Sequence, residues 1–218
     1  MKAILIGASG ATGKELLNRL LDNDAFDEVV ALVRKPLPVK NQKLQTIIVD
    51  FEESWQWKDV VHGDVAFSCL GTTLRNVGSK KNQHRVDYDY QYEFAKIAKA
   101  NKIPYFILVS SSTANYKSPI FYSRMKGELE KAITELKFKN LVVFRPGPLI
   151  RPNTDRIGER IGVNVICFFN KLGLFRKMKP LPVSDLADLM LDYALNPAER
   201  LDILESGRIL NEIQLIKI

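Results

Sequence analysis

Three glycines near the start of the chain have the spacing of a phosphate-binding turn. The segment GASGATG, residues 7–13, follows the apolar run KAILI. In such a turn Gly7 would allow the tight bend, Gly10 would let backbone N–H groups approach a pyrophosphate, and Gly13 would let a helix pack closely on a strand. The N-terminus of that helix would add partial positive charge. The spacing, GxxGxxG rather than GxGxxG, predicts a dinucleotide-binding loop made of Gly7, Ser9, Gly10, Ala11, Thr12 and Gly13.

Two basic residues after the second apolar run indicate which dinucleotide would bind. NAD enzymes usually carry Asp or Glu about 20 residues past the glycines, where it bonds the ribose 2′-OH. Here Arg34 and Lys35 follow EVVALV directly, and a guanidinium binds a 2′-phosphate bidentately. We therefore predict NADP(H) as the cofactor, with NAD as the alternative. The two basic residues could instead form only a solvated turn. We expect Asp50, with Phe51 beside it, to border the adenine pocket. The alternative is that Asp50 caps a turn.

Two tyrosine–lysine pairs could move a proton. Tyr92–Lys96 and Tyr122–Lys126 both have the YxxxK spacing, which puts tyrosine and lysine on one face of a helix. A neighbouring ammonium and an oxidised nicotinamide ring would lower a tyrosine pKa from its unperturbed value of about 10. Ligands of open α/β sheets bind beyond the carboxyl ends of the strands. Tyr122 follows such an end, whereas Tyr92 lies inside an apolar helix stripe, so we predict Tyr122 and Lys126 as the catalytic pair and Tyr92 as a packing residue.

These residues require a fold that brings several strand ends together. Apolar runs typical of buried strands alternate with segments of helical periodicity. This alternation predicts an α/β doubly wound parallel sheet, a Rossmann fold, with helices on both faces. Strands are expected within 2–10, 28–35, 45–51, 64–73, 104–112 and 140–150, and helices within 11–24, 86–101, 123–137 and 184–196, the last capped by Ser184. We expect one domain over residues 1–218, with 151–180 as a small substrate-side segment.

The composition is that of an ordinary globular protein. Hydrophobic residues make up 46% and charged residues 26% of the 218 residues. The net charge is +7, concentrated in residues 73–180, and would attract an anionic ligand such as a dinucleotide. No nucleic-acid-binding motif is present. His62 and His84 lack the spacing of metal ligands, so no metal is expected. Two distant cysteines, no visible signal peptide and no long apolar run favour a cytoplasmic protein without a membrane span.

Six segments together resemble the atypical branch of the short-chain dehydrogenase/reductase superfamily. They are GASGATG, with Ser9 for the usual Thr, and CLGTT, RVDYDY, LVSSS, YSRMKGELE and VFRPGPLI, and within that branch they are similar to the Tat-interacting-protein oxidoreductase-like family. The resemblance covers residues 1–205. It implies that the segment after the fourth strand lines the cofactor, and that the segment after the sixth brings backbone to the nicotinamide side. The corresponding residues are Cys69, Leu70, Gly71 and Thr72, and Arg145, Pro146 and Gly147.

The resemblance also implies an active site of serine, tyrosine and lysine. Tyrosine would be the acid and base, lysine would lower its pKa and hold the nicotinamide ribose, and serine would bond the substrate carbonyl. Ser110, Ser111 and Ser112 leave the fifth strand, where alternation turns Ser111 to the opposite face from the other two. Alignment with the family favours Ser111, and the SSSxT pattern of sugar-nucleotide epimerases favours Ser112, so both remain candidates.

We therefore expect an NADP(H)-dependent oxidoreductase that acts on a small carbonyl or alcohol, with a small-molecule substrate as its partner. The alternative is an NADPH-binding regulatory or redox-sensor protein with little turnover. An epimerase is disfavoured, since the C-terminal substrate domain of those enzymes has little counterpart here. A flavin or biliverdin reductase is disfavoured by the YxxxK pairs. Both a monomer and a homodimer are compatible with the sequence.

Overall fold

A seven-stranded parallel sheet forms the centre of the computed structural model, which describes residues 1–150, 180–197 and 200–216. The strand order is β3-β2-β1-β4-β5-β6-β9, and each neighbouring pair runs parallel. The strands are β1 (Lys2–Ile6), β2 (Glu28–Val33), β3 (Leu44–Ile48), β4 (Val65–Ser68), β5 (Tyr105–Val109), β6 (Asn140–Arg145) and β9 (Arg200–Glu205). The chain runs outward from β1 to β3 and then returns to β4, so the direction of winding switches between β1 and β4. The predicted doubly wound fold is confirmed, and its switch point is where such sheets bind ligands.

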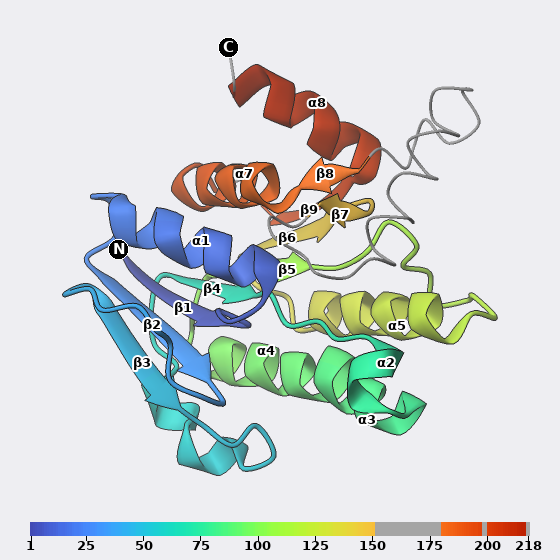
Figure 1. The fold of residues 1–218 in the computed structure, drawn as a ribbon, viewed down its shortest axis with the longest axis horizontal. Helices are drawn as coiled ribbons and strands as arrows, with labels where there is room; N and C mark the ends of the chain where they lie inside the picture. The colour runs from blue at the N-terminus through green and yellow to red at the C-terminus, as the bar shows by residue number, and fades with distance from the viewer. Residues whose placement is uncertain (151–179, 198–199, 217–218) are drawn as a thin grey trace.

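Helices cover both faces of the sheet (Figure 1). On one face lie α1 (Ala11–Asp22), α7 (Val183–Leu195) and α8 (Ser206–Ile216), and on the other α4 (Tyr90–Ala100) and α5 (Phe121–Glu135). Alternate residues of β1 therefore enter two separate cores: Ala3 and Leu5 pack on the α1 side, Ile4 and Ile6 on the α4 side. Burial on both faces explains why the strands are continuous apolar runs rather than alternating ones.

The structure adds elements that periodicity did not predict. Two short helices, α2 (Leu74–Val77) and α3 (Lys80–His84), follow β4, and a π-helical turn at Arg85–Asp89 leads into α4. The predicted helix 86–101 is therefore not a regular α-helix at its start. Strand β9 and helix α8 were also not predicted. Strand β9 lacks a continuous apolar run because it is an edge strand with mostly exposed or half-buried side chains.

Two further expectations concern the last third of the chain. Helix α7 begins at Val183 after Pro182, so Ser184 lies inside its first turn and is not the predicted cap. Strand β7 (Leu149–Ile150) pairs in parallel with β8 (Leu181–Pro182). The expected substrate-side segment at 151–180 lies, except for residue 180, outside the described residues. It stays a prediction, as does the single-domain organisation. Within the described ranges, no helix has the length and apolar character needed to cross a bilayer.

Candidate active site

The glycine turn joins β1 to α1 in a space that excludes side chains. Gly7 has φ +84°, and a Cβ there would lie 2.5 Å from the carbonyl carbon of Cys69. A Cβ on Gly13 would lie 2.2 Å from the Gly7 carbonyl oxygen. Gly7 therefore requires its left-handed backbone, and Gly13 allows α1 to pack directly on the turn, as the spacing predicts. Gly10 has an extended backbone at the N-cap of α1, where no described side chain caps the helix. This arrangement fits a pyrophosphate on the first-turn N–H groups.

A pocket of about 370 Å³ opens beside this turn, at the switch point between β1 and β4. It brings together segments that are far apart in the sequence. These segments are the first turn of α1, the segment after β4, the end of β5 and the start of α5. The residues that line the pocket include Gly10, Ala11, Thr12, Cys69, Leu70, Gly71, Thr72, Ser110, Tyr122 and Lys126. Nine of the sequence-predicted cofactor and catalytic residues, Tyr122 and Lys126 among them, thus line one pocket.

Tyr122 lies in the first turn of α5, and Lys126 follows one turn later on the same face. Lys126 is 3% exposed and its Nζ donates to the carbonyl oxygen of Val109 at 3.3 Å. Burial, and to a smaller extent the charge of Asp87, raise the pKa of Tyr122, while a hydrogen bond from Ser111 lowers it. The protein groups alone therefore do not produce the lowered tyrosine pKa that the sequence predicts. Desolvation outweighs the effect of Ser111, although the Tyr122 residue as a whole is 37% exposed.

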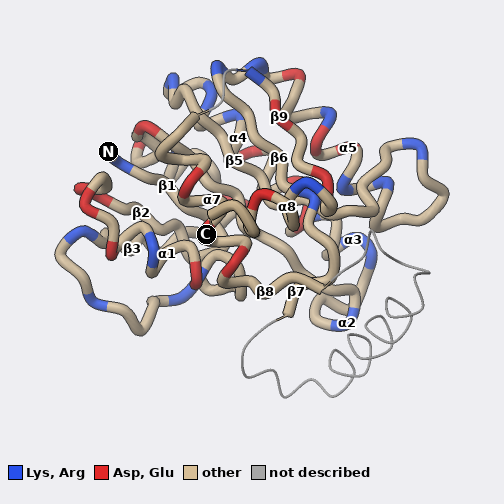
Figure 2. The backbone as a smooth tube through the Cα atoms, turned by 90° about the horizontal axis from the view of Figure 1, so that it is seen from above, with Lys and Arg blue, Asp and Glu red and all other residues tan. Residues whose placement is uncertain are grey.

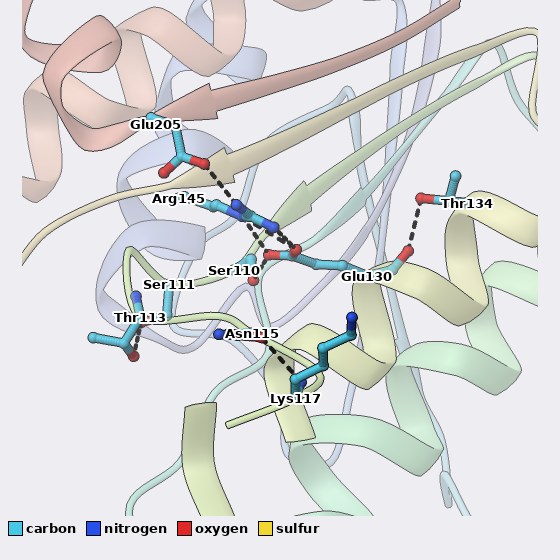
Figure 3. Close-up of polar contacts among 9 residues, drawn as sticks. All are labelled: Ser110, Ser111, Thr113, Asn115, Lys117, Glu130, Thr134, Arg145 and Glu205. Carbon is cyan, nitrogen blue, oxygen red and sulfur yellow. Dashed lines mark hydrogen bonds and ion pairs between the residues drawn. The ribbon is translucent and has the colours of Figure 1, made fainter. Parts of the chain in front are cut away.

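The three serines at the end of β5 have different partners. The Ser111 hydroxyl lies 3.1 Å from the Thr113 hydroxyl (Figure 3), and its influence lowers the pKa of Tyr122. The Ser110 hydroxyl lies in the pocket wall but donates to Glu130 of α5 (Figure 3), and the Ser112 backbone N–H donates to the Pro146 carbonyl oxygen at 3.0 Å. Of the two candidates, Ser111 is the serine that influences the pKa of Tyr122, and the choice between Ser111 and Ser112 stays a prediction.

The second tyrosine–lysine pair lies outside this pocket. Lys96 Nζ is 2.6 Å from the Glu93 carboxylate and 5.6 Å from the centre of the Tyr92 ring. The Tyr92 ring packs against the core on the α4 side and lies 5.9 Å from the Tyr88 ring. These contacts agree with the packing role predicted for Tyr92.

A second pocket, of about 590 Å³, lies between α1 and the loop after β2. Its lining includes four side chains suited to a phosphate: Ser9, Lys14, Arg34 and Lys35. The loop that joins β2 and β3 carries several basic residues beside α1 (Figure 2). Sequence reasoning missed Lys14. Its position directly after Gly13 was the available signal, because that position falls in the first turn of a helix whose N-terminus already attracts anions.

Asp50 and Phe51 do not line either pocket. Asp50 accepts the backbone N–H of Glu52 at 2.9 Å, which is the turn-capping alternative, and Phe51 is buried against the Tyr90 ring at 5.4 Å. Phe51 is therefore a core residue that stacks on Tyr90 just after β3. The expected position of Asp50 and Phe51 beside an adenine ring stays a prediction.

The Arg145 side chain points into an ion-pair cluster with Glu130 and Glu205 (Figure 3) and does not line the pocket beside the glycine turn. Its Nε lies 3.1 Å from both carboxylate oxygens of Glu130, which is 4% exposed, and Nη1 lies 2.6 Å from Glu205. Hydrogen bonds to Glu130, and further pairing with Glu205, raise the pKa of the Arg145 guanidinium. The side chain thus joins β6, α5 and β9. A backbone role for Arg145, Pro146 and Gly147 beside the nicotinamide stays a prediction.

Strand order, glycine turn and pocket together define a dinucleotide-binding domain of the Rossmann type. Residues 7–149 match the NAD(P)H-binding family. Protein HTATIP2 of Rattus norvegicus is 35% identical over 95% of this chain and 87% of its own length, and the mitochondrial protein FMP52 of Eremothecium gossypii is 31% identical over 98% of both chains. The chain belongs to the NAD(P)H-binding family, in the atypical short-chain dehydrogenase/reductase group with HTATIP2 and FMP52.

Solved structures share the fold across nearly the whole chain. The oxidoreductase ylbE of Lactococcus lactis has a TM-score of 0.67 at 16% identity and covers 98% of this chain and 97% of its own. The enzyme WbmH of Bordetella bronchiseptica, solved with NAD+, has a TM-score of 0.72 at 14% identity and covers 99% of this chain and 79% of its own. The family match makes the chain a protein that binds a nicotinamide dinucleotide, and the solved structures share its fold.

The expectation of a cytoplasmic location is wrong by the same comparison. FMP52 relatives from Eremothecium gossypii, Candida albicans and Scheffersomyces stipitis are named mitochondrial. The expectation depended on two distant cysteines without a CxxC motif, on the lack of a visible signal peptide and on the lack of a long apolar run. Cysteines without such a motif fit a reducing environment and do not distinguish one reducing compartment from another.

Proposed function

We propose that this protein is an NADPH-dependent oxidoreductase that reduces a small carbonyl compound, or oxidises the corresponding alcohol, with Tyr122 as acid and base. One observation carries the proposal: Tyr122 and Lys126 line the same pocket as the first turn of α1 and the segment after β4. An acid/base residue therefore lies beside the region suited to a dinucleotide, at the edge of the sheet where hydride acceptors of this fold bind.

The residues present fit the phosphates of NADPH. The uncapped N-terminus of α1 at Gly10 would hold the pyrophosphate. Arg34, Lys35 and Lys14 line one pocket and would hold the 2′-phosphate, since their cations favour a dianion that NADH lacks. Lys126 would hold the nicotinamide ribose. Bound NADPH supplies a hydride to the carbonyl carbon of the substrate.

The chain's own groups complete the reduction with a proton. Ser111 would donate a hydrogen bond to the carbonyl oxygen, and the Tyr122 hydroxyl would transfer its proton to that oxygen as the hydride arrives at carbon, which leaves an alcohol and a phenolate. Because burial raises the pKa of Tyr122, the residue is protonated at neutral pH and is ready to act as an acid. The Lys126 ammonium would then stabilise the phenolate until solvent returns the proton.

The test is single-turnover oxidation of NADPH with an aldehyde, a ketone and the quinone menadione. Tyr122→Phe removes only a hydroxyl, so we expect the rate to fall by roughly 10²–10⁴-fold with NADPH affinity retained. Tyr92→Phe is the matched control and should turn over like the wild type. A Tyr122→Phe variant as fast as the wild type would refute the catalytic role. Tight NADPH binding with no turnover of any carbonyl would refute the enzyme and favour a sensor.

A further inference from the structure

Two short helices after β4, α2 and α3, lie against the pocket beside the glycine turn. Helix α2 ends at Gly78, whose left-handed backbone (φ +75°) lets the chain turn into α3. The Asn82 side-chain amide joins the two helices, because it donates to the Val77 carbonyl oxygen at 2.9 Å. Gln83 of α3 is 5% exposed and lines the pocket, and its amide donates to the Thr72 carbonyl oxygen at 3.5 Å. These contacts fix α3 against the pocket wall.

Lys80 lies on the same face of α3 as Gln83 and reaches the start of α5. Residues three apart on a helix are neighbours on one face. The Lys80 Nζ lies 5.6 Å from the centre of the Phe121 ring, and Phe121 directly precedes Tyr122, which lines the pocket. The shared helix face and the ring contact both place the Lys80 ammonium at the rim of the pocket, on the side of the proposed acid/base.

The rim around Lys80 is basic. Segments 65–86 and 94–127 contain no Asp or Glu, and they supply β4, α2, α3, β5 and the start of α5. Helices α2 and α3 accordingly carry basic but no acidic residues (Figure 2). Arg85, just after α3, pairs with Glu52 at 3.1 Å. Lys80 is exposed and has no acidic partner among the described residues, so its charge is available to an anion.

The wall of the pocket next to Lys80 is apolar. Leu74 of α2 and Leu149 of β7 line the pocket, and the Phe121 ring is half-buried beside the ammonium. An apolar wall with a cation at its rim suits a ligand that has an apolar body and an anionic end. The phosphates of a dinucleotide are accounted for elsewhere, because they would lie at the N-terminus of α1 and beside Arg34.

We propose that Lys80 is a specificity-determining residue that binds a carboxylate of the substrate, so that the preferred substrate is a small carbonyl compound with an apolar body and a carboxylate group. The inference rests on the proposed function, since it takes the substrate carbonyl to lie at Tyr122. The ammonium would pair with the carboxylate at the solvated rim, while Leu74 and Leu149 contact the apolar body. A neutral analogue of the same shape would lack that charge pair.

The test compares two aldehydes of the same shape, 4-formylbenzoate and 4-formylbenzamide, as substrates with NADPH. We expect the wild type to reduce the carboxylate with about fivefold higher kcat/KM, the effect of one solvated charge pair, and added salt to narrow the difference. Lys80→Met should lower kcat/KM for 4-formylbenzoate to that of 4-formylbenzamide and leave the Kd of NADPH unchanged. Lys81→Met removes a charge from the same helix and is the control that should keep the preference.

A wild type that reduces both aldehydes equally, or a Lys80→Met variant that keeps the preference, would overturn the inference. A Lys80→Met variant with weakened NADPH binding would assign Lys80 to the cofactor and would equally overturn it.

If neither aldehyde is reduced, the corresponding alcohols, 4-(hydroxymethyl)benzoate and 4-(hydroxymethyl)benzamide, provide a second measurement. They can bind beside NADPH without reacting, and calorimetry measures their affinities. Tighter binding of the carboxylate in the wild type, lost in Lys80→Met, would support the inference while the absence of turnover refutes the proposed function. Equal or undetectable binding of the two alcohols would overturn the inference as well, and the two failures are thereby distinguished.

Discussion

Removal of the Arg34 guanidinium should weaken NADPH binding and leave NADH binding nearly unchanged. Arg34 lines the pocket that also holds Ser9, Lys14 and Lys35. A charge-assisted hydrogen bond contributes about 1.5–3 kcal/mol, and about 1.4 kcal/mol corresponds to a tenfold change in Kd. Arg34 is exposed, so solvent screens it, and two lysines remain. We therefore expect Arg34→Ala to raise the Kd of NADPH by about tenfold, the low end of that range.

Fluorescence titration of both dinucleotides against wild type and Arg34→Ala measures this effect. Lys40→Ala is the matched control, because Lys40 lies on the same loop but does not line the pocket. Added salt should narrow the difference between wild type and variant for NADPH, since it screens exposed charges. An equal loss for NADPH and NADH, or no loss for either, would show that Arg34 does not contact the 2′-phosphate.

Two more substitutions test the roles of neighbouring elements. Gly10→Val should abolish NADPH binding with an unchanged circular dichroism spectrum: the extended backbone of Gly10 accepts a side chain, and its Cβ would lie 3.2 Å from the Gly7 carbonyl oxygen. Binding that survives would place the pyrophosphate elsewhere. Arg145→Leu should lower the free energy of unfolding in urea by about 3 kcal/mol, because buried Glu130 loses its cation, while the Kd of NADPH stays constant. A stable variant, or one that loses NADPH, would contradict the structural role of the Arg145 side chain.

Local features of the fold were predictable from the sequence because they depend on residues near one another. A buried strand is a run of apolar residues, and the glycine turn needs Gly7 and Gly13 within seven positions of the chain. The pairing of Tyr122 with Lys126 follows from helical geometry alone. The failures were also local in origin. The helical period of apolar residues over 86–101 does not reveal the π-helical turn, because one added residue in a helix changes the apolar pattern very little.

The sequence by itself determined the parallel sheet, the glycine turn and the tyrosine–lysine pair. Only the tertiary structure decided which groups meet them. It brings Lys14 and Arg34 into one pocket and the Asp87 carboxylate to the backbone N–H of Thr72. The physical reason is that β1, β4, β5 and α5 converge at one edge of the sheet from distant parts of the chain. The direction of a side chain past the end of a strand depends on those neighbours, whereas alternation holds only within the strand.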